Sequence, residues 1–135
     1  MSFDLTIFDP ADAPKDAEAF GDWLEAAEED GDWAVTDEAC TEPLKRFFSE
    51  TCRRLPPLNG PDAPSDEHVD DMVTGDYNLS RSLIQVSLPF SAAEETVPAI
   101  LTIAAKHGLG LYDPQGGQVY LPTGPGGALD LAFEI

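Results

Sequence analysis

The stretch from Ala104 to Pro122, AAKHGLGLYDPQGGQVYLP, constrains the local structure more tightly than any other part of the chain. Lys106 and His107 suit the last turn of a helix, where positive charge interacts favourably with the helix dipole. Gly108 can adopt the left-handed conformation in which many helices end. Residues 109–113 and 118–121 are typical of two strands joined by a Pro-Gln-Gly-Gly turn. We therefore expect a helix that stops at a glycine and leads directly into a hairpin.

The first part of the chain carries one strand pattern and two helix patterns. Apolar residues partly alternate over residues 3–8, which predicts a first strand. Apolar residues then recur at steps of three and four over residues 14–28, which predicts an amphipathic helix with Pro14 in its first turn. A second helix is predicted from Thr41 to Leu55, where two prolines end it. We expect its basic residues to pair with the acids of the first helix. They are Lys45, Arg46, Arg53 and Arg54.

The middle of the chain contains a long loop, a strand and a third helix. Residues 56–76 are rich in proline, glycine and acids and lack apolar periodicity, which predicts a loop inside one domain. The region 77–88 holds the most regular strand pattern, expected at the centre of a sheet. The capping-box pattern of Ser91 and Glu94 predicts the start of the third helix at these residues. Pro98 lies inside that helix, so either the helix kinks there or its regular part begins near Thr96.

The order of these elements predicts the fold class. We expect an α+β fold with a single small mixed or antiparallel sheet (β-α-α-β-α-β-β) and helices packed on one face. The domain is placed at residues 1–122, and residues 123–135 form a glycine-rich spacer and a terminal strand. The apolar residues of this tail alternate strictly, so they either add to the sheet edge or pair with a second copy of the chain as a homodimer. They are Leu129, Leu131, Phe133 and Ile135.

The charge of the chain restricts its partners. With 26 acids and 7 bases, the formal net charge is −19. Nucleic acids and anionic membranes are themselves negatively charged, so binding to either is not expected. No segment approaches the roughly 20 apolar residues that cross a bilayer, and the N-terminus has no basic segment followed by an apolar run, as a signal peptide would. The composition predicts a cytoplasmic protein whose partner, if it has one, is basic.

Two groups of residues have compositions typical of functional sites. His107, with Tyr112 and Asp113 close by in sequence, would suit a small enzyme or a ligand-binding domain. The preferred explanation of this histidine is its position at a helix C-terminus, where the helix dipole favours it. The acids and histidine of residues 62–71 resemble a metal cluster in composition, but they match neither the calcium-loop pattern nor H-E-x-x-H. We expect no catalytic set, no metal and no cofactor.

The acids are concentrated near the N-terminus. Residues 1–76 hold 21 of the 26 acids and 5 of the 7 bases. A concentrated anionic face would speed the encounter with a basic protein, and two tryptophans would supply apolar anchors there. Solvation of a helix face would produce the same concentration of acids. Adaptation to high salt should spread acids more evenly, although the low lysine content is also typical of it. Partial burial around the first helix is the alternative explanation of the tryptophans. The predicted partner-binding residues are Asp16, Glu18, Asp22, Trp23, Glu25, Glu28, Glu29, Asp32 and Trp33.

Several short motifs resemble a widespread group of small bacterial proteins of unassigned function. They are MSFDL at residues 1–5, FDP at 8–10, PPLNG at 56–60, SLI at 82–84, AKHGL at 105–109 and YDPQ at 112–115. The resemblance spans residues 1–122, and Pro98 and the tail from Thr123 lie outside it. The group has no established catalytic residues. Its small acidic members look like immunity proteins, which neutralise toxins by covering them, so the resemblance implies an inhibitor of a basic toxin or enzyme.

Overall fold

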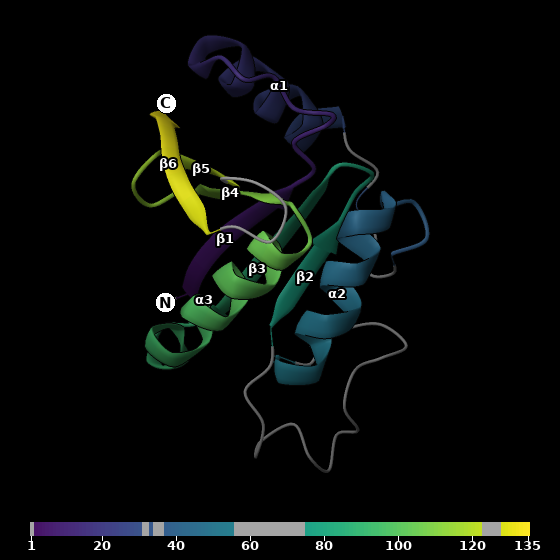
Figure 1. Cartoon of the computed structure of the whole chain (residues 1–135), viewed down its shortest axis with the longest axis vertical. Coiled ribbons are helices and arrows are strands. Elements are labelled where there is room, and N and C mark those ends of the chain that lie inside the picture. Colours follow the sequence, from purple (N-terminus) through teal and green to yellow (C-terminus); the bar gives the residue numbers. More distant parts are fainter. Residues whose placement is uncertain (1, 31–32, 34–36, 56–74, 123–127) are drawn as a thin grey trace.

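The computed structural model describes residues 2–30, 33, 37–55, 75–122 and 128–135 (Figure 1). Most of the predicted loop at 56–76 therefore lies outside the described residues. Within the described residues, nine elements follow one another: β1 (Ser2–Phe8), α1 (Ala17–Asp30), α2 (Glu42–Arg54), β2 (Asp76–Leu79), β3 (Leu83–Pro89), α3 (Phe90–Lys106), β4 (Gly110–Asp113), β5 (Gln118–Pro122) and β6 (Leu129–Glu134).

The six strands form one sheet in the order β2-β3-β1-β4-β5-β6. Every neighbouring pair is antiparallel, so the predicted α+β class with a single sheet is confirmed. The first strand of the chain lies in the middle of this sheet, between β3 and β4. Because both of these strands run opposite to β1, they run in the same direction, and α3 connects them across it.

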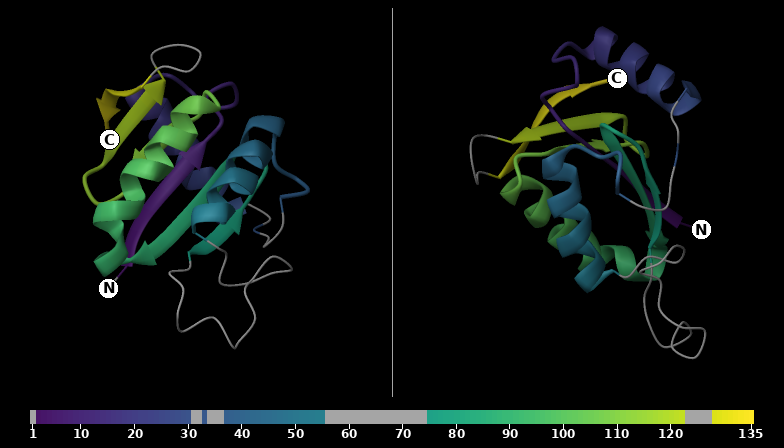
Figure 2. Two further views of the ribbon diagram at one scale, coloured as in Figure 1. Left: turned by 60° about the horizontal axis from the view of Figure 1, so that its bottom comes forward. Right: turned by 90° about the vertical axis from the view of Figure 1, so that its right-hand side faces the viewer.

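The helices cover both faces of the sheet, so the expectation that they pack on one face is wrong for α1. In the left view of Figure 2, α2 and α3 lie in front of the sheet and α1 lies behind it. The strands carry apolar side chains on both faces, and each face therefore needs a cover. Leu5 and Ile7 of β1 face the cluster under α2 and α3, whereas Phe8, Leu83 and Val119 belong to the cluster under α1.

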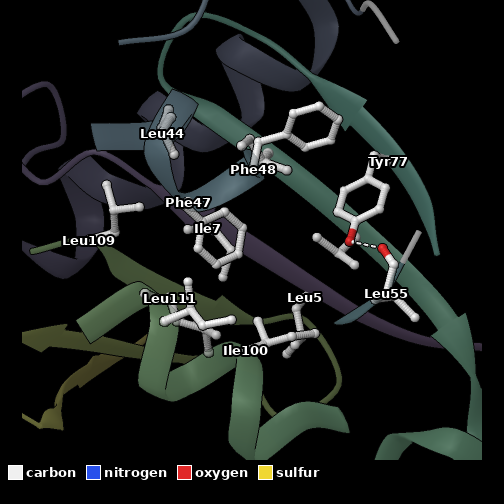
Figure 3. Close-up of a cluster of buried hydrophobic side chains, with 14 of the residues drawn as sticks. Leu5, Ile7, Leu44, Phe47, Phe48, Leu55, Tyr77, Ile100, Leu109 and Leu111 are labelled. Atoms are coloured by element: carbon white, nitrogen blue, oxygen red, sulfur yellow. Dashed lines mark hydrogen bonds between the residues drawn. The ribbon is translucent and has the colours of Figure 1, made fainter. Parts of the chain in front are cut away.

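The larger core lies between the sheet and the helix pair α2 and α3 (Figure 3). Phe47 and Leu44 of α2 and Ile100 of α3 are almost completely buried against the strands. Tyr77 of β2 contributes a polar contact to this core, because its hydroxyl donates a hydrogen bond of 2.7 Å to the carbonyl oxygen of Leu55. That bond satisfies one of the carbonyls left free at the C-terminal end of α2. Burial raises the pKa of the Tyr77 hydroxyl well above its usual value, so it remains a donor.

Replacing Tyr77 by phenylalanine is expected to lower the free energy of unfolding by about 1–2 kcal/mol, because the Leu55 carbonyl would lose its buried partner. Urea denaturation measures the change. Tyr120→Phe is the matched control, since the Tyr120 hydroxyl is only part-buried and bonds the side chain of Gln118 at 2.8 Å. A loss in the control equal to that in Tyr77→Phe would contradict the importance of the buried bond.

The end of α3 confirms the predicted glycine stop. Gly108 has a φ of 70°. Its N–H donates to the carbonyl of Ala105 at 3.1 Å, and the N–H of Leu109 donates to the carbonyl of Ala104 at 2.9 Å. This pair of bonds is the Schellman arrangement, which satisfies two carbonyls at the helix end. The chain then turns directly into β4 as expected.

The starts of two helices differ from the prediction. α1 begins at Ala17 and not at Pro14, because Asp16 accepts a hydrogen bond of 3.1 Å from the N–H of Ala19 and so caps the helix. α3 begins at Phe90, with Pro89 as its N-cap residue and without a side-chain cap bond. The helix continues through Pro98 to Lys106, so a later start near Thr96 is wrong.

The predicted strand at 77–88 is a hairpin of two strands. β2 and β3 are joined at residues 80–82, and the N–H of Ser80 donates to the carbonyl of Leu83 at 2.8 Å. β2 forms one edge of the sheet and β6 the other. Within the described parts of the chain, no helix has both the length and the apolar character to cross a membrane.

The terminal strand β6 joins the edge of the sheet next to β5. This is one of the two arrangements predicted for the tail. Its side chains do not share a single face. Val119 pairs with Phe133 and Tyr120 with Leu131, so Ala132 is an extra residue that interrupts the alternation. As a result, Phe133 packs in the cluster under α1, while Leu129 packs against the larger core beside α3.

Candidate functional site

One candidate surface is the outward side of α1. Four of its carboxylates recur at steps of three and four residues and are all exposed, so they lie on one side of the helix. We call these residues, Glu18, Asp22, Glu25 and Glu29, the acidic face. α1 contains no basic residue. Among the described ion pairs, none involves this helix. The acidic face therefore presents uncompensated negative charge to the solvent.

Two more predicted partner-binding acids have contacts within the protein. Asp16 caps α1, as described above. Glu28 lies next to the sheet, where its carboxylate accepts a hydrogen bond of 3.4 Å from the side-chain amide of Gln85. Both side chains are exposed and add to the negative charge of α1. Asp32 lies outside the described residues.

The two predicted tryptophan anchors, Trp23 within α1 and Trp33 after it, are partly buried. Trp23 packs against Phe8 and Phe20, with ring centroids 6.2 and 5.5 Å apart. The indole N–H of Trp33 donates to the carbonyl of Glu28 at 3.3 Å, and its ring packs against the same cluster. Both tryptophans thus help to attach α1 to the sheet, which is the alternative interpretation of these residues.

A second candidate surface contains most of the positive charge of the chain. Five of the seven lysines and arginines belong to α2 or α3. The expected pairing of the α2 bases with the acids of α1 is wrong, because the sheet separates the two helices. The described ion pairs join Lys45 to Glu42 at 3.7 Å, Lys106 to Glu50 at 2.9 Å and His107 to Glu50 at 3.3 Å. Neither Arg46 nor Arg53, both exposed, has an ion-pair partner among the described residues.

Glu50 connects α2 to the end of α3. The same carboxylate oxygen contacts the ammonium group of Lys106 and the imidazole of His107. The hydrogen bond from Lys106, with a further contribution from His107, lowers the pKa of Glu50 below its usual value. Glu50 therefore stays ionised under mildly acidic conditions. This carboxylate is shared by Lys106 and His107, and it forms no ion pair with Arg46 or Arg53.

Two hollows flank this contact and share Glu50 and Arg53. The first has a volume of about 340 Å³ and is lined by Lys45, Arg46, Ser49, Glu50, Arg53 and His107. The second has a volume of about 610 Å³ and is lined by Glu50, Arg53, Glu95, Pro98, Ala99, Thr102 and Ile103. We refer to both together as the α2–α3 groove. It has a cationic end on α2 and a largely uncharged end on α3, and sequence reasoning did not find it. The sequence did contain a signal for its cationic end, because Lys45, Ser49 and Arg53 recur at steps of four residues and therefore lie on one side of a helix.

The sequence-based candidate site at His107, Tyr112 and Asp113 is not assembled. His107 lies against Glu50 on the side of α2. Tyr112 packs on the opposite face of the sheet, with its ring centroid 6.2 Å from that of Phe20. Asp113 accepts a hydrogen bond of 3.0 Å from the N–H of Gln115 and so supports the β4–β5 turn. These three residues cannot act on one substrate together.

The thiol of Cys40 is buried and has a structural contact. Its sulfur donates a hydrogen bond of 3.1 Å to the carbonyl of Ser80. Burial, with a smaller effect of Asp37, raises the pKa of Cys40 to about 11. At neutral pH the group is therefore a thiol and not the nucleophilic thiolate.

The tail residues predicted for a homodimer are divided between the core and the surface. Phe133 packs against Phe20, with ring centroids 5.5 Å apart, and Leu129 packs beside α3. Leu131 and Ile135 are 51 % and 45 % exposed. A dimer contact through this strand would thus rely on Leu131 and Ile135, and the negative charge of both copies would oppose it.

The described parts of the chain contain no group of three or more His, Cys, Asp or Glu side chains that could hold a metal ion. The acidic segment 62–71 lies outside them. Comparison of the chain with protein-family models, with curated proteins and with solved structures finds no match.

Proposed function

We propose that this protein is an acidic interaction module that binds a basic protein through the acidic face of α1, in the manner of an immunity-type inhibitor of a toxin or enzyme. The observation that carries the proposal is the separation of charge. Four exposed carboxylates lie on one side of α1 without a basic neighbour on that helix, while the ion pairs of the described chain all involve α2 and lie either within it or between it and the C-terminal end of α3. Concentrated charge of one sign attracts an oppositely charged partner and raises its association rate.

In the proposed interface, carboxylates and tryptophans have different roles. Carboxylates at a rim set the rate and the salt dependence of association, whereas buried apolar anchors supply most of the affinity. Trp23 of α1 and Trp33, which packs in the same cluster, are partly exposed, so their exposed edges are the anchors available to a partner there. The contact therefore covers the acidic face and the exposed parts of these two rings.

A quadruple variant tests the proposal. Glu18→Gln, Asp22→Asn, Glu25→Gln and Glu29→Gln remove the charge of the acidic face and retain the Asp16 cap. When the protein is used as bait in native lysate of its source at low salt, wild type is expected to retain a protein of high isoelectric point that the variant does not retain. With that partner purified, the association rate of the variant is expected to fall by about tenfold or more, because charge at a rim acts on the rate. The partner is expected to lose its activity when bound.

The control changes the same number of charges elsewhere. Glu38→Gln, Glu94→Gln, Asp130→Asn and Glu134→Gln alter exposed acids outside α1 and raise the net charge equally. Retention of the partner by this control separates a local surface from a general effect of net charge. If wild type retains no basic protein, or if both quadruple variants lose it equally, the acidic face serves solvation or salt adaptation and the proposal fails.

A further inference from the structure

The α2–α3 groove has no role in the proposed function, since it lies on the other side of the sheet from α1. We propose that it is a binding site for a small organic phosphate monoester, with the phosphate at the cationic end and the organic part along α3. The argument rests on the positions of Arg46 and Arg53, on the contacts of Glu50, and on the lining of the two hollows.

The first step is that basic residues are clustered here, although the chain as a whole is strongly acidic. The protein has a formal charge of −19, yet three bases, Lys45, Arg46 and Arg53, line a single hollow of about 340 Å³. Like charges placed together repel one another unless an anion lies between them. In this hollow the one acidic lining residue is Glu50, whose carboxylate contacts α3.

The second step concerns the donors that remain. Arg46 and Arg53 have no ion-pair partner among the described residues, and each guanidinium offers several N–H groups in a planar fork. Such forks match the oxygen atoms of a phosphate and bind them in pairs. The hydroxyl of Ser49 lies in the same lining and adds a further donor. The set favours a compact dianion over a single carboxylate.

The third step uses the uncharged end of the groove. Past Arg53, the second hollow is lined by Pro98, Ala99 and Ile103, and Glu95 is its additional acid. Apolar lining accommodates carbon atoms, and a carboxylate opposes a second anionic group. The groove therefore selects a ligand with one phosphate and an organic part that is uncharged or carries hydrogen-bond donors.

Binding of defined probes tests this site in the full chain. Titration of isotope-labelled protein with phenyl phosphate at low salt is expected to shift the backbone amide resonances of α2 and of the C-terminal half of α3, while those of α1 stay unchanged. Inorganic phosphate is expected to cause the same shifts on α2 with at least threefold weaker affinity, because it does not reach the lining of α3. Benzoate, which has the ring without the phosphate, is expected to bind at least tenfold more weakly than phenyl phosphate.

Variants connect the binding to the named side chains. Arg53→Gln and Arg46→Gln are each expected to weaken phenyl phosphate at least fivefold, and Arg53→Lys, which keeps the charge but loses the fork, is expected to be intermediate. Arg81→Gln is the matched control, since Arg81 is an exposed arginine between β2 and β3 and its loss changes the net charge equally. The control is expected to bind within twofold of wild type.

Three results would overturn the proposal: no resonance shifts with millimolar phenyl phosphate, equal weakening by Arg81→Gln and Arg53→Gln, or equal affinity for phenyl phosphate and benzoate. The acidic-face quadruple variant is expected to bind phenyl phosphate as wild type does. This site and the proposed function can therefore fail independently.

Discussion

Replacing Phe20 by alanine is expected to lower the free energy of unfolding by about 3–5 kcal/mol, the usual cost of removing a large buried aromatic side chain. Phe20 is fully buried and lies at the centre of the cluster that attaches α1 to the sheet. Its ring centroid is 5.0 Å from that of Phe8, 5.5 Å from those of Trp23 and Phe133, and 6.2 Å from that of Tyr112. These ring contacts reach three strands, β1, β4 and β6.

The loss should be uneven across the molecule. The larger core under α2 and α3 does not contain Phe20, so the amide protons of α1 are expected to exchange much faster in the variant while those of β1 and β3 remain the best protected. Hydrogen exchange followed by mass spectrometry measures this difference, and guanidinium denaturation gives the total. Leu131→Ala is the control, because Leu131 is 51 % exposed and its truncation should cost no more than about 0.5 kcal/mol. A loss below 1 kcal/mol for Phe20→Ala would mean that α1 is held by other contacts.

Replacing Gly110 by alanine is expected to destabilise the protein by about 1–3 kcal/mol, the typical cost of forcing extra atoms into a packed core. Gly110 pairs directly with Phe8 across β1 and β4. A Cβ atom at this position would overlap the ring of Phe8. That ring is fully buried and held by Phe20 and Trp23, so it cannot move away at low cost.

Replacing a second glycine by alanine is expected to change the stability in the opposite direction. Gly21 lies inside α1, and a Cβ atom there would meet no atom within 4 Å. Gly21→Ala is therefore expected to stabilise the protein by about 0.5–1 kcal/mol, because alanine loses less backbone freedom in a helix. Thermal unfolding of both variants provides the comparison.

A double-mutant cycle tests the overlap at Gly110. Phe8→Leu should reduce the loss of stability caused by Gly110→Ala. Additive effects of the two substitutions would contradict the overlap.

Patterns that depend on neighbouring residues in the sequence predicted their structures well. The helix stop at Gly108 is local, because one residue with a positive φ and the two bonds around it complete the helix end. The hairpin of β4 and β5 is local for the same reason. The start of α1 was also predictable, because Asp16 can accept the capping hydrogen bond from the N–H three residues later, at Ala19. The prediction instead placed the start at Pro14, three residues too early.

Patterns that depend on distant partners were not predictable. The apolar stripe of α1 identifies the side of the helix that is buried, but not which face of the sheet receives it. A clue lay in the strands, because Phe8, Leu83 and Val119 are apolar out of phase with the main buried stripe, and they require a second cover. The interruption of β6 at Ala132 depends on its register with β5. The α2–α3 groove depends on the side of the sheet that α1 occupies, since the predicted pairing with α1 would have neutralised its bases.

The central place of β1 in the sheet has a consequence for how the chain reaches its native state. Its hydrogen-bonding neighbours are β3 at residues 83–89 and β4 at 110–113. During synthesis, β1 leaves the ribosome with both of its edges open and remains so until most of the chain has been made. Open apolar strands of this kind invite pairing with other chains. The high density of like charge in the residues that follow β1 is expected to oppose contact between such nascent chains until β3 and β4 have been made.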